Sequence, residues 1–318
     1  IRHNGRFEPT RGYCTDVFFD AAHRWIRRRA GTGQPFFAWI TPNAPHDPFI
    51  SPGPEWEAPY RDRGLSTNAV RYYAMIAHLD AAVGRLLDGL AAGGLRERTL
   101  VIFLTDNGHS VPGLFNAGLR AQKGTPYEGG IRVPSFWSWP GRLPSGRDCD
   151  RLTAHLDLLP TLLELAGRPP PAGAALEGRS LVPLLENPGA AWPNRHHFTH
   201  LGRWEHGTAR ASAHRQAAVQ DERFKLVNNV ELYDLLADPG ESRNLIDSHP
   251  VEAGRLRTAY AAWWESVLPA ALLNEDALGP YLNPFKAAFW QQFGGGPDAA
   301  LRDRMEPGWK FNPERPRF

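Results

Sequence analysis

The sequence contains little lysine and little cysteine for its length. Its 318 residues include four lysines and two cysteines, and 36 Lys and Arg side chains nearly balance 34 Asp and Glu side chains. Cys14 and Cys149 are too few and too far apart to form a disulfide framework or a zinc site. The formal charge of +2 is small and arginine is scattered, which argues against a nucleic-acid-binding surface.

Long apolar runs are also absent, since none approaches the roughly 20 residues that span a bilayer. We therefore predict no transmembrane segment. The chain begins at Ile1 without methionine and without a charged leader followed by an apolar run. This start predicts either that a signal was removed or that the sequence is a fragment, and the motifs described below favour a fragment.

Over the first 195 residues, patterns typical of helices alternate with patterns typical of buried strands. One amphipathic stretch follows Thr15, a good N-cap residue. The apolar run TLVIFLT (99–105) is typical of a strand buried on both faces. Strand, helix and strand in this order predict an α/β domain with a mostly parallel sheet sandwiched by helices. The expected helices are 16–29, 67–92 and 155–167, and the expected strands are 35–41, 99–105 and 131–139.

The C-terminal part has a different pattern. Short strand-like pieces, AAVQ and RFKLV, precede ELYDLLADPGE, and a helix is expected over 251–268. These pieces predict a smaller antiparallel α+β subdomain, so the chain divides into 1–195 and 196–318. The tail after the helix is rich in Phe and Trp, and we expect it to pack on the rest of the protein.

Three polar clusters stand at or near the ends of expected strands, where ligands of open parallel sheets bind. The second cluster, FLTDNGHS, places Asp106 and Asn107 directly after a strand. Gly108 makes it easy for the chain to leave the strand there, so that both side chains can face one ion. Their oxygens suit Ca²⁺ or Mg²⁺, but Ca²⁺ takes about six to eight oxygens. From these residues alone, an Asx-type turn is the simpler interpretation.

The other two clusters carry groups that suit an anion. His46 lies between two prolines in APHDP, and its imidazole can shuttle a proton or hold an anion. Lys123 lies in KGTPYEGG, where a compact ammonium suits an anion that binds and leaves. The alternatives are that His46 is held by backbone groups and that Lys123 is a solvated surface lysine. The histidine-rich stretch is interpreted as a surface or substrate-rim loop and not as a metal cluster; it holds His196, His197, His200, His206 and His214.

Taken together and in order, these segments resemble the sulfatase family. The segments are APHDP (44–48), Asp106-Asn107-Gly108, KGTPYEGGIRVP (123–134), WPGR (139–142), DLLPTLLELAG (157–167), GRSLVPLL (178–185) and RFKLVNNVELYDLLADPGESRNL (223–245). The resemblance covers about residues 12–264. It implies an alkaline-phosphatase-like α/β domain with a smaller C-terminal antiparallel subdomain. It also implies hydrolysis of sulfate esters at a Ca²⁺ or Mg²⁺ ion, with a sulfated small molecule or glycan as partner.

The resemblance also implies roles for single residues. Asp106 and Asn107 correspond to metal ligands. Lys123 corresponds to the lysine that bridges the sulfate and leaving-group oxygens, and His46 to a histidine that contacts the sulfate or the leaving group. His109 is expected to line the substrate pocket. The family is often exported, so a periplasmic or secreted location is the expectation, although the sequence leaves the compartment and the oligomeric state open.

The sequence departs from the family pattern at the nucleophile. Sulfatases use a formylglycine made from the Cys or Ser of a C/S-x-P-S/A-x-R segment, and an Asp-Asp pair supplies further metal ligands. The sequence has no Asp-Asp dipeptide, and neither cysteine is followed by proline two residues later. SWPGR, starting at Ser138, has similar spacing, but its place after the lysine motif argues against Ser138 as nucleophile. We expect the formylglycine and the first metal ligands to precede Ile1.

A fragment of this kind is expected to have little activity by itself. Two alternatives stay open. One is a phosphonate or phosphate monoester hydrolase of the same superfamily, because the residues present fit either anion. The other is a non-catalytic pseudo-sulfatase that binds a cation or a glycan.

Overall fold

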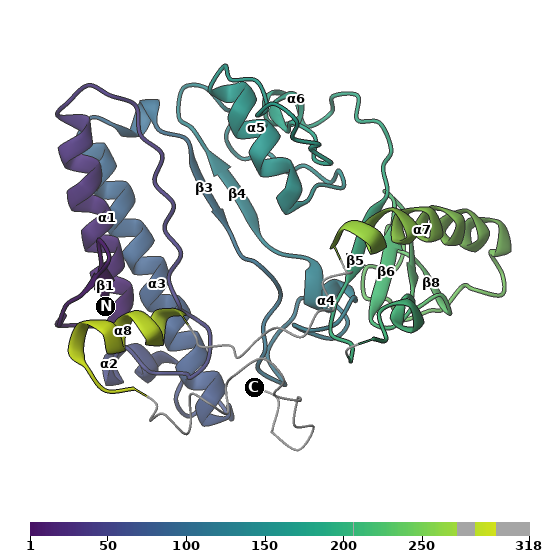
Figure 1. Cartoon of the computed structure of the whole chain (residues 1–318), viewed down its shortest axis with the longest axis horizontal. Helices are drawn as coiled ribbons and strands as arrows, with labels where there is room; N and C mark the ends of the chain where they lie inside the picture. The colour runs from purple at the N-terminus through teal and green to yellow at the C-terminus, as the bar shows by residue number, and fades with distance from the viewer. Residues whose placement is uncertain (206, 272–283, 297–318) are drawn as a thin grey trace.

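Figure 1 shows the computed structural model of the chain, which describes residues 1–205, 207–271 and 284–296. Two long helices, α1 (Cys14–Ala30) and α3 (Thr67–Ala92), lie side by side in it. Both confirm predicted helices, and their apolar stripes meet in one cluster. The predicted cap is wrong, because α1 begins after Tyr13 and Thr15 is fully buried in its first turn. Ser66 does cap α3 with its hydroxyl.

A two-stranded ladder lies between the helix pair and the C-terminal sheet in Figure 1. It joins β3 (Val101–Leu104) to β4 (Ser135–Ser138), so two predicted strands are confirmed in shorter form. The prediction that the strand at 99–105 is buried on both faces is wrong. Every β3 residue is partly exposed, and Phe136 of β4 is 65% exposed. All strand pairs within the described residues are antiparallel.

The expected strand over 35–41 is not a strand in the structure. These residues have no regular secondary structure, and Phe37 and Trp39 are 63% and 68% exposed. An apolar run becomes a strand only where a neighbouring strand pairs with its backbone groups. No strand of the described residues pairs with this segment.

The C-terminal part forms a four-stranded antiparallel sheet in the order β5-β6-β7-β8. One face of the sheet is covered by α7 (Pro250–Ala271), whose Leu256 and Tyr260 are buried in a shared apolar core with Val219 and Leu226. The predicted antiparallel subdomain and its closing helix are thus confirmed. The strands are β5 (His197–His200), β6 (Ala217–Gln220), β7 (Phe224–Val227) and β8 (Glu231–Asp234).

The other elements are short. They are β1 (Arg2–His3), β2 (Arg6–Phe7), α2 (Pro54–Glu57), η1 (Ala58–Tyr60), η2 (Arg96–Arg98), α4 (Glu128–Ile131), η3 (His155–Asp157), α5 (Leu158–Leu165), α6 (Val182–Glu186), η4 (Arg210–Ser212) and α8 (Pro284–Phe293). The predicted helix over 155–167 is confirmed as η3 and α5. Helix α8 packs Phe285 and Phe289 against Phe7, as expected for that part of the tail. The rest of the tail, 272–283 and 297–318, lies outside the described residues.

A helix that could cross a membrane is not found among the described residues. The division of the chain into 1–195 and 196–318 stays a prediction.

Candidate functional site

Two loops that carry predicted site residues are joined backbone to backbone. We call residues 105–110, which follow β3, the DNG loop, and residues 120–132, which contain α4, the lysine loop. The Lys123 N–H donates a hydrogen bond of 2.9 Å to the carbonyl oxygen of His109. Residues that lie more than ten positions apart in sequence therefore become neighbours at the end of β3.

Glycines make this close approach possible. The Gly108 N–H donates to the carbonyl oxygen of Gly130 at 3.0 Å. A Cβ on Gly108 would overlap the carbonyl oxygen of Gly129, and a Cβ on Gly129 would overlap backbone carbonyl oxygens of the lysine loop. Only glycine lets the two backbones pack at this distance. Gly108 is therefore needed to seat the DNG loop on the lysine loop, and Gly129 is needed for the lysine loop to fold back on itself.

Asp106 and Asn107 lie where the chain leaves β3, as predicted. The Asp106 side chain is exposed and makes no hydrogen bond or ion pair within the described part of the chain. Asn107 is half-buried, and its backbone carbonyl accepts a hydrogen bond from the Thr105 hydroxyl at 3.3 Å. Burial raises the pKa of Tyr72 on α3, and the negative charges of Tyr73 and Asp106 add to this rise.

The described residues alone do not fit a complete cation site. Asp106 and Asn107 offer a carboxylate and an amide oxygen, the right chemistry for Ca²⁺ or Mg²⁺, but Ca²⁺ needs about six to eight oxygens. No group of three His, Cys, Asp or Glu side chains in residues 1–205, 207–271 and 284–296 is arranged to hold a metal. Two protein donors leave most of the coordination shell to other ligands.

The two remaining site residues of these loops have free polar groups. Lys123 is half-buried, and its ammonium has no hydrogen-bond or ion-pair partner among the residues that the structure describes. The ring nitrogens of His109 are both shielded from solvent and both lack a hydrogen-bond partner there. Buried polar groups normally find partners, so the unpaired His109 imidazole, on a loop bonded to that of Lys123, is typical of a ligand-binding position.

His46 lies on a separate, exposed loop. Its Nδ1 is 2.7 Å from the carbonyl oxygen of Asp47 and 3.0 Å from the Asp47 carboxylate. The ring forms no hydrogen bond or ion pair with the DNG loop or the lysine loop within the described residues. The Phe49 ring of this loop packs edge-on against Tyr72 of α3 at 5.9 Å. The His46 side chain is held locally, and its place at the site stays a prediction.

His155 also lies against the DNG loop, although no sequence pattern predicts it there. Its Nε2 lies 2.8 Å from the carbonyl oxygen of Thr105, the residue before Asp106. Its position is fixed by Asp157, which is fully buried, accepts the Ala154 N–H at 2.8 Å and pairs with Arg195 at 2.8 Å. The periodic pattern predicts the helix here, but it carries no signal for a contact with a loop 50 residues away.

The histidine-rich stretch has structural partners. The His200 ring lies 3.0 Å from the carbonyl oxygen of Ser212, and His196 accepts from Arg255 at 3.1 Å. Burial lowers the pKa of His196, His197 and His200, which favours their neutral forms. His206 lies outside the described residues. The other members do not converge on a metal site.

Ser138 stands at the wrong end of the ladder to serve the site. Val101 pairs with Ser138, whereas Leu104, next to the DNG loop, pairs with Ser135. Three residue steps along a strand span about 10 Å. The Ser138 hydroxyl accepts a hydrogen bond from Arg96 at 2.5 Å. This geometry supports the argument against Ser138 as nucleophile.

Family models match the sequence of the chain across the DNG loop and the lysine loop. A family model described as Sulfatase matches residues 2–168, and one described as N-sulphoglucosamine sulphohydrolase, C-terminal, matches residues 121–257. The chain belongs to the sulfatase family. A sulfatase from Formosa agariphila is 32% identical over 264 residues, 76% of this chain and 48% of that protein. Arylsulfatase A from Bos taurus is 32% identical over 268 residues, 74% of this chain and 48% of that protein.

Solved structures agree on the fold of this sulfatase chain. Ps i-CgsB, in complex with k-i-k-neocarrahexaose, has a TM-score of 0.71 at 26% identity, over 82% of this chain and 57% of that one. A second crystal structure of Ps i-CgsB has a TM-score of 0.71 at 23% identity, over 95% of this chain and 64% of that one. These neighbours confirm the predicted alkaline-phosphatase-like fold. The chain spans about half the length of the curated relatives it matches.

Proposed function

We propose that the protein to which this chain belongs hydrolyses a sulfate ester. The observation that carries the proposal is the backbone bond between Lys123 and His109, because it joins the loop that carries an unpaired ammonium to the loop that carries Asp106 and Asn107. The sulfatase family match over both motifs supports the same reaction.

In this proposal Lys123 and His46 act on the sulfuryl group. Its oxygens carry negative charge during transfer, and a fixed ammonium stabilises that charge. The His46 imidazole holds the sulfate or leaving-group oxygen and can move a proton to it. His109, with two unpaired ring nitrogens, lines the pocket beside Lys123.

We also propose a Ca²⁺ or Mg²⁺ ion with Asp106 and Asn107 as two of its ligands. The chemistry of the donors supports this, but two donors are too few for a site. The other ligands would come from water or from protein beyond these residues. A formylglycine nucleophile is also expected from protein beyond these residues, since neither Cys14 nor Cys149 stands in a suitable motif.

A sulfated carbohydrate is the substrate class that we propose. The crystal structure of Ps i-CgsB, which is 26% identical to this chain, is of its complex with k-i-k-neocarrahexaose. N-acetylgalactosamine-6-sulfatase from Canis lupus familiaris is 32% identical over 176 residues, 54% of this chain and 32% of that protein. Both names point to sugar substrates for those proteins, which supports testing sulfated oligosaccharides first.

The test compares three substrates on the full-length protein: an arylsulfate, an arylphosphate and a sulfated oligosaccharide, each with and without Ca²⁺. We expect sulfate release that depends on Ca²⁺ and exceeds phosphate release. Equal or faster release of phosphate would contradict the sulfatase assignment in favour of a phosphate or phosphonate monoesterase. Ca²⁺ or glycan binding without turnover of any substrate would favour a pseudo-sulfatase.

A further inference from the structure

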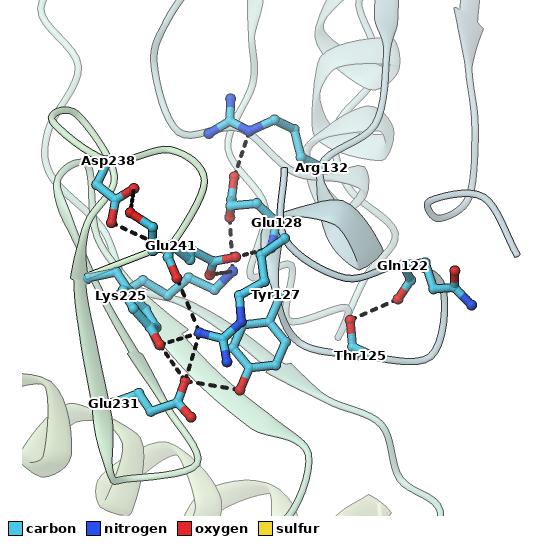
Figure 2. A network of polar contacts seen from close by, with 12 residues as sticks. Gln122, Thr125, Tyr127, Glu128, Arg132, Lys225, Glu231, Asp238 and Glu241 are labelled. Carbon is cyan, nitrogen blue, oxygen red and sulfur yellow. Dashed lines mark hydrogen bonds and ion pairs between the residues drawn. The ribbon is translucent and has the colours of Figure 1, made fainter. Parts of the chain in front are cut away.

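A buried lysine of the C-terminal sheet is placed between two carboxylates from different parts of the chain. Lys225, on β7, is completely buried. Its Nζ lies 2.9 Å from Glu128 Oε1 of α4 and 2.9 Å from Glu241 Oε1, in the turn after β8. Figure 2 shows the three side chains converging between the lysine loop and the sheet. The ammonium thus ties the lysine loop to the sheet.

The pKa values of the two carboxylates in this group are shifted in opposite directions. Burial tends to raise the pKa of Glu128, but the Lys225 ammonium and the Arg132 guanidinium outweigh it, so the pKa is lowered. For Glu241, burial outweighs Lys225 and the pKa is raised. Glu241 compensates by accepting the backbone N–H of Glu128 through Oε2 at 2.7 Å. Among the residues that the structure describes, Lys225 is therefore the one cation paired with both buried carboxylates.

A second contact holds the beginning of the lysine loop to the same sheet. Arg120 Nη1 donates to the backbone carbonyl oxygen of Glu241 at 3.1 Å and to Glu231 Oε2 at 3.3 Å. Its guanidinium lies 4.0 Å from the centre of the Tyr127 ring, and Tyr127 donates to Glu231 at 2.9 Å. Both the beginning and the end of residues 120–132 are thus anchored on β7, β8 and the turn that follows (Figure 2).

The backbone on each side of this contact has unusual torsion angles. Ala121 and Glu241 have φ values of 61° and 53°, in the left-handed region that residues with a Cβ rarely adopt. Such conformations persist where the surroundings hold them, and they cluster at functional sites. Lys123, two residues after Ala121, is the group whose position this arrangement determines.

We propose that Lys225 is a positioning residue: with Glu128 and Glu241 it fixes the lysine loop so that the Lys123 ammonium stands beside the DNG loop. The C-terminal sheet is on this view part of the scaffold of the site. The inference rests on the proposed function only where it assigns Lys123 to the sulfuryl anion. The claim about the loop stands on the contacts themselves.

Amide hydrogen exchange of the full-length protein tests the claim about the loop. In Lys225→Met, two buried carboxylates lose their shared cation, and breaking a buried pair is strongly destabilising where it acts. We expect amides of residues 119–132 to exchange at least about a hundredfold faster, and β6 and β7 amides to change by less than about tenfold. Equal acceleration of the loop and the sheet, or an unchanged loop, would overturn the proposal.

Arg223→Met is the matched control. It removes an ion pair of 2.7 Å between Arg223, which directly precedes β7, and Asp234 at the end of β8, outside the lysine loop. We expect no change in residues 119–132. If Lys225→Met does not fold, Glu241→Gln serves instead, because it keeps an acceptor for the Glu128 N–H and removes only the charge. Faster exchange confined to the loop is expected again, and unchanged exchange would count against the proposal.

Turnover separates positioning from a merely structural role. With a sulfate ester, we expect Lys225→Met to lower kcat by about a hundredfold, the scale of a small misplacement of a catalytic group, with little change in KM. Lys225→Arg keeps a cation and is expected to recover part of kcat. If no variant or wild-type protein releases sulfate, the proposed function fails, while the exchange result still decides the positioning claim.

Discussion

The Gly108 N–H donates a hydrogen bond of 3.0 Å to the carbonyl oxygen of Gly130, and this bond joins the DNG loop to the lysine loop. No side chain fits between the two backbones, because a Cβ on Gly108 would overlap the Gly129 carbonyl oxygen. The position of the Lys123 backbone relative to the DNG loop is therefore set by backbone packing.

Replacing Gly108 with alanine tests this packing. The added methyl group forces the loops apart, and overpacking of this kind typically costs about 1–3 kcal/mol. We expect Gly108→Ala to lower the free energy of unfolding, measured with urea, by about 1–3 kcal/mol or more. The control is Gly84→Ala, since Gly84 lies in α3 with no atom near the added Cβ. Alanine there is expected to stabilise the helix by about 0.5–1 kcal/mol. Equal effects of the two substitutions would contradict the close approach.

Replacing Lys123 tests the anion site. Loss of one preorganised charge that stabilises a transition state typically lowers kcat by about 10²–10³. We expect that loss for Lys123→Met in sulfate ester hydrolysis. Lys123→Arg is expected to recover only part of it, because guanidinium and ammonium present their donors differently. Lys286→Met, on α8, is the control and should leave kcat unchanged. A Lys123→Met protein with wild-type kcat would exclude the assigned role.

Replacing Asp106 tests the cation without requiring turnover. A ligand that binds only the folded state raises the free energy of unfolding by about 2.7 kcal/mol at a hundred times its Kd. We expect Ca²⁺ to stabilise the wild-type protein and Asp106→Ala to lose most of that stabilisation. Asp150→Ala, at an exposed loop position, should keep it. The metal assignment is wrong if the Ca²⁺ effect survives in Asp106→Ala.

Local patterns were enough to predict much of the fold and part of the site. The helices α1 and α3, the antiparallel C-terminal sheet and the residues of the two loops all follow from short-range sequence features. The contact of His155 with Thr105 and the ion pair of Lys225 with Glu128 join residues 50 and 97 positions apart. Nothing in a local pattern specifies such partners. For the same reason, an apolar run at 35–41 could not show whether a neighbouring strand would pair with it.

Asp221 gives the stability a defined pH dependence. Burial tends to raise the pKa of Asp221, but backbone N–H groups of Phe224 and Arg223 and the Arg255 guanidinium outweigh it and lower the pKa. Its folded pKa thus lies below the ordinary value of 3.8, so its contribution is present above that pH and is lost as the pH falls through the folded pKa.

We expect Asp221→Asn to lower the free energy of unfolding at pH 7 by about 1–3 kcal/mol, the scale for hydrogen bonds to a charged group. The difference from the wild-type protein should begin to shrink as the pH falls below about 4, where the carboxylate takes up a proton in the unfolded chain, and should continue to shrink as the pH falls through the lowered folded pKa. Urea unfolding at pH 7, 5, 4 and 3 measures it. The exposed Asp247 provides the control substitution Asp247→Asn. A difference that stays constant over this range would show that the charge of Asp221 is not the cause.

Ser138 lies in a segment that resembles a nucleophile motif in the sequence, but it does not lie at the candidate site in the structure. SWPGR has a spacing similar to that of a nucleophile segment, yet register places Ser138 opposite Val101, about 10 Å along the ladder from the residue that adjoins the DNG loop. Its hydroxyl is already bonded to Arg96. We therefore expect Ser138→Ala to keep kcat for a sulfate ester within about twofold and to change stability by no more than about 0.5 kcal/mol. Loss of turnover in a folded Ser138→Ala protein, matching the loss in Lys123→Met, would mean that the nucleophile lies in this chain after all.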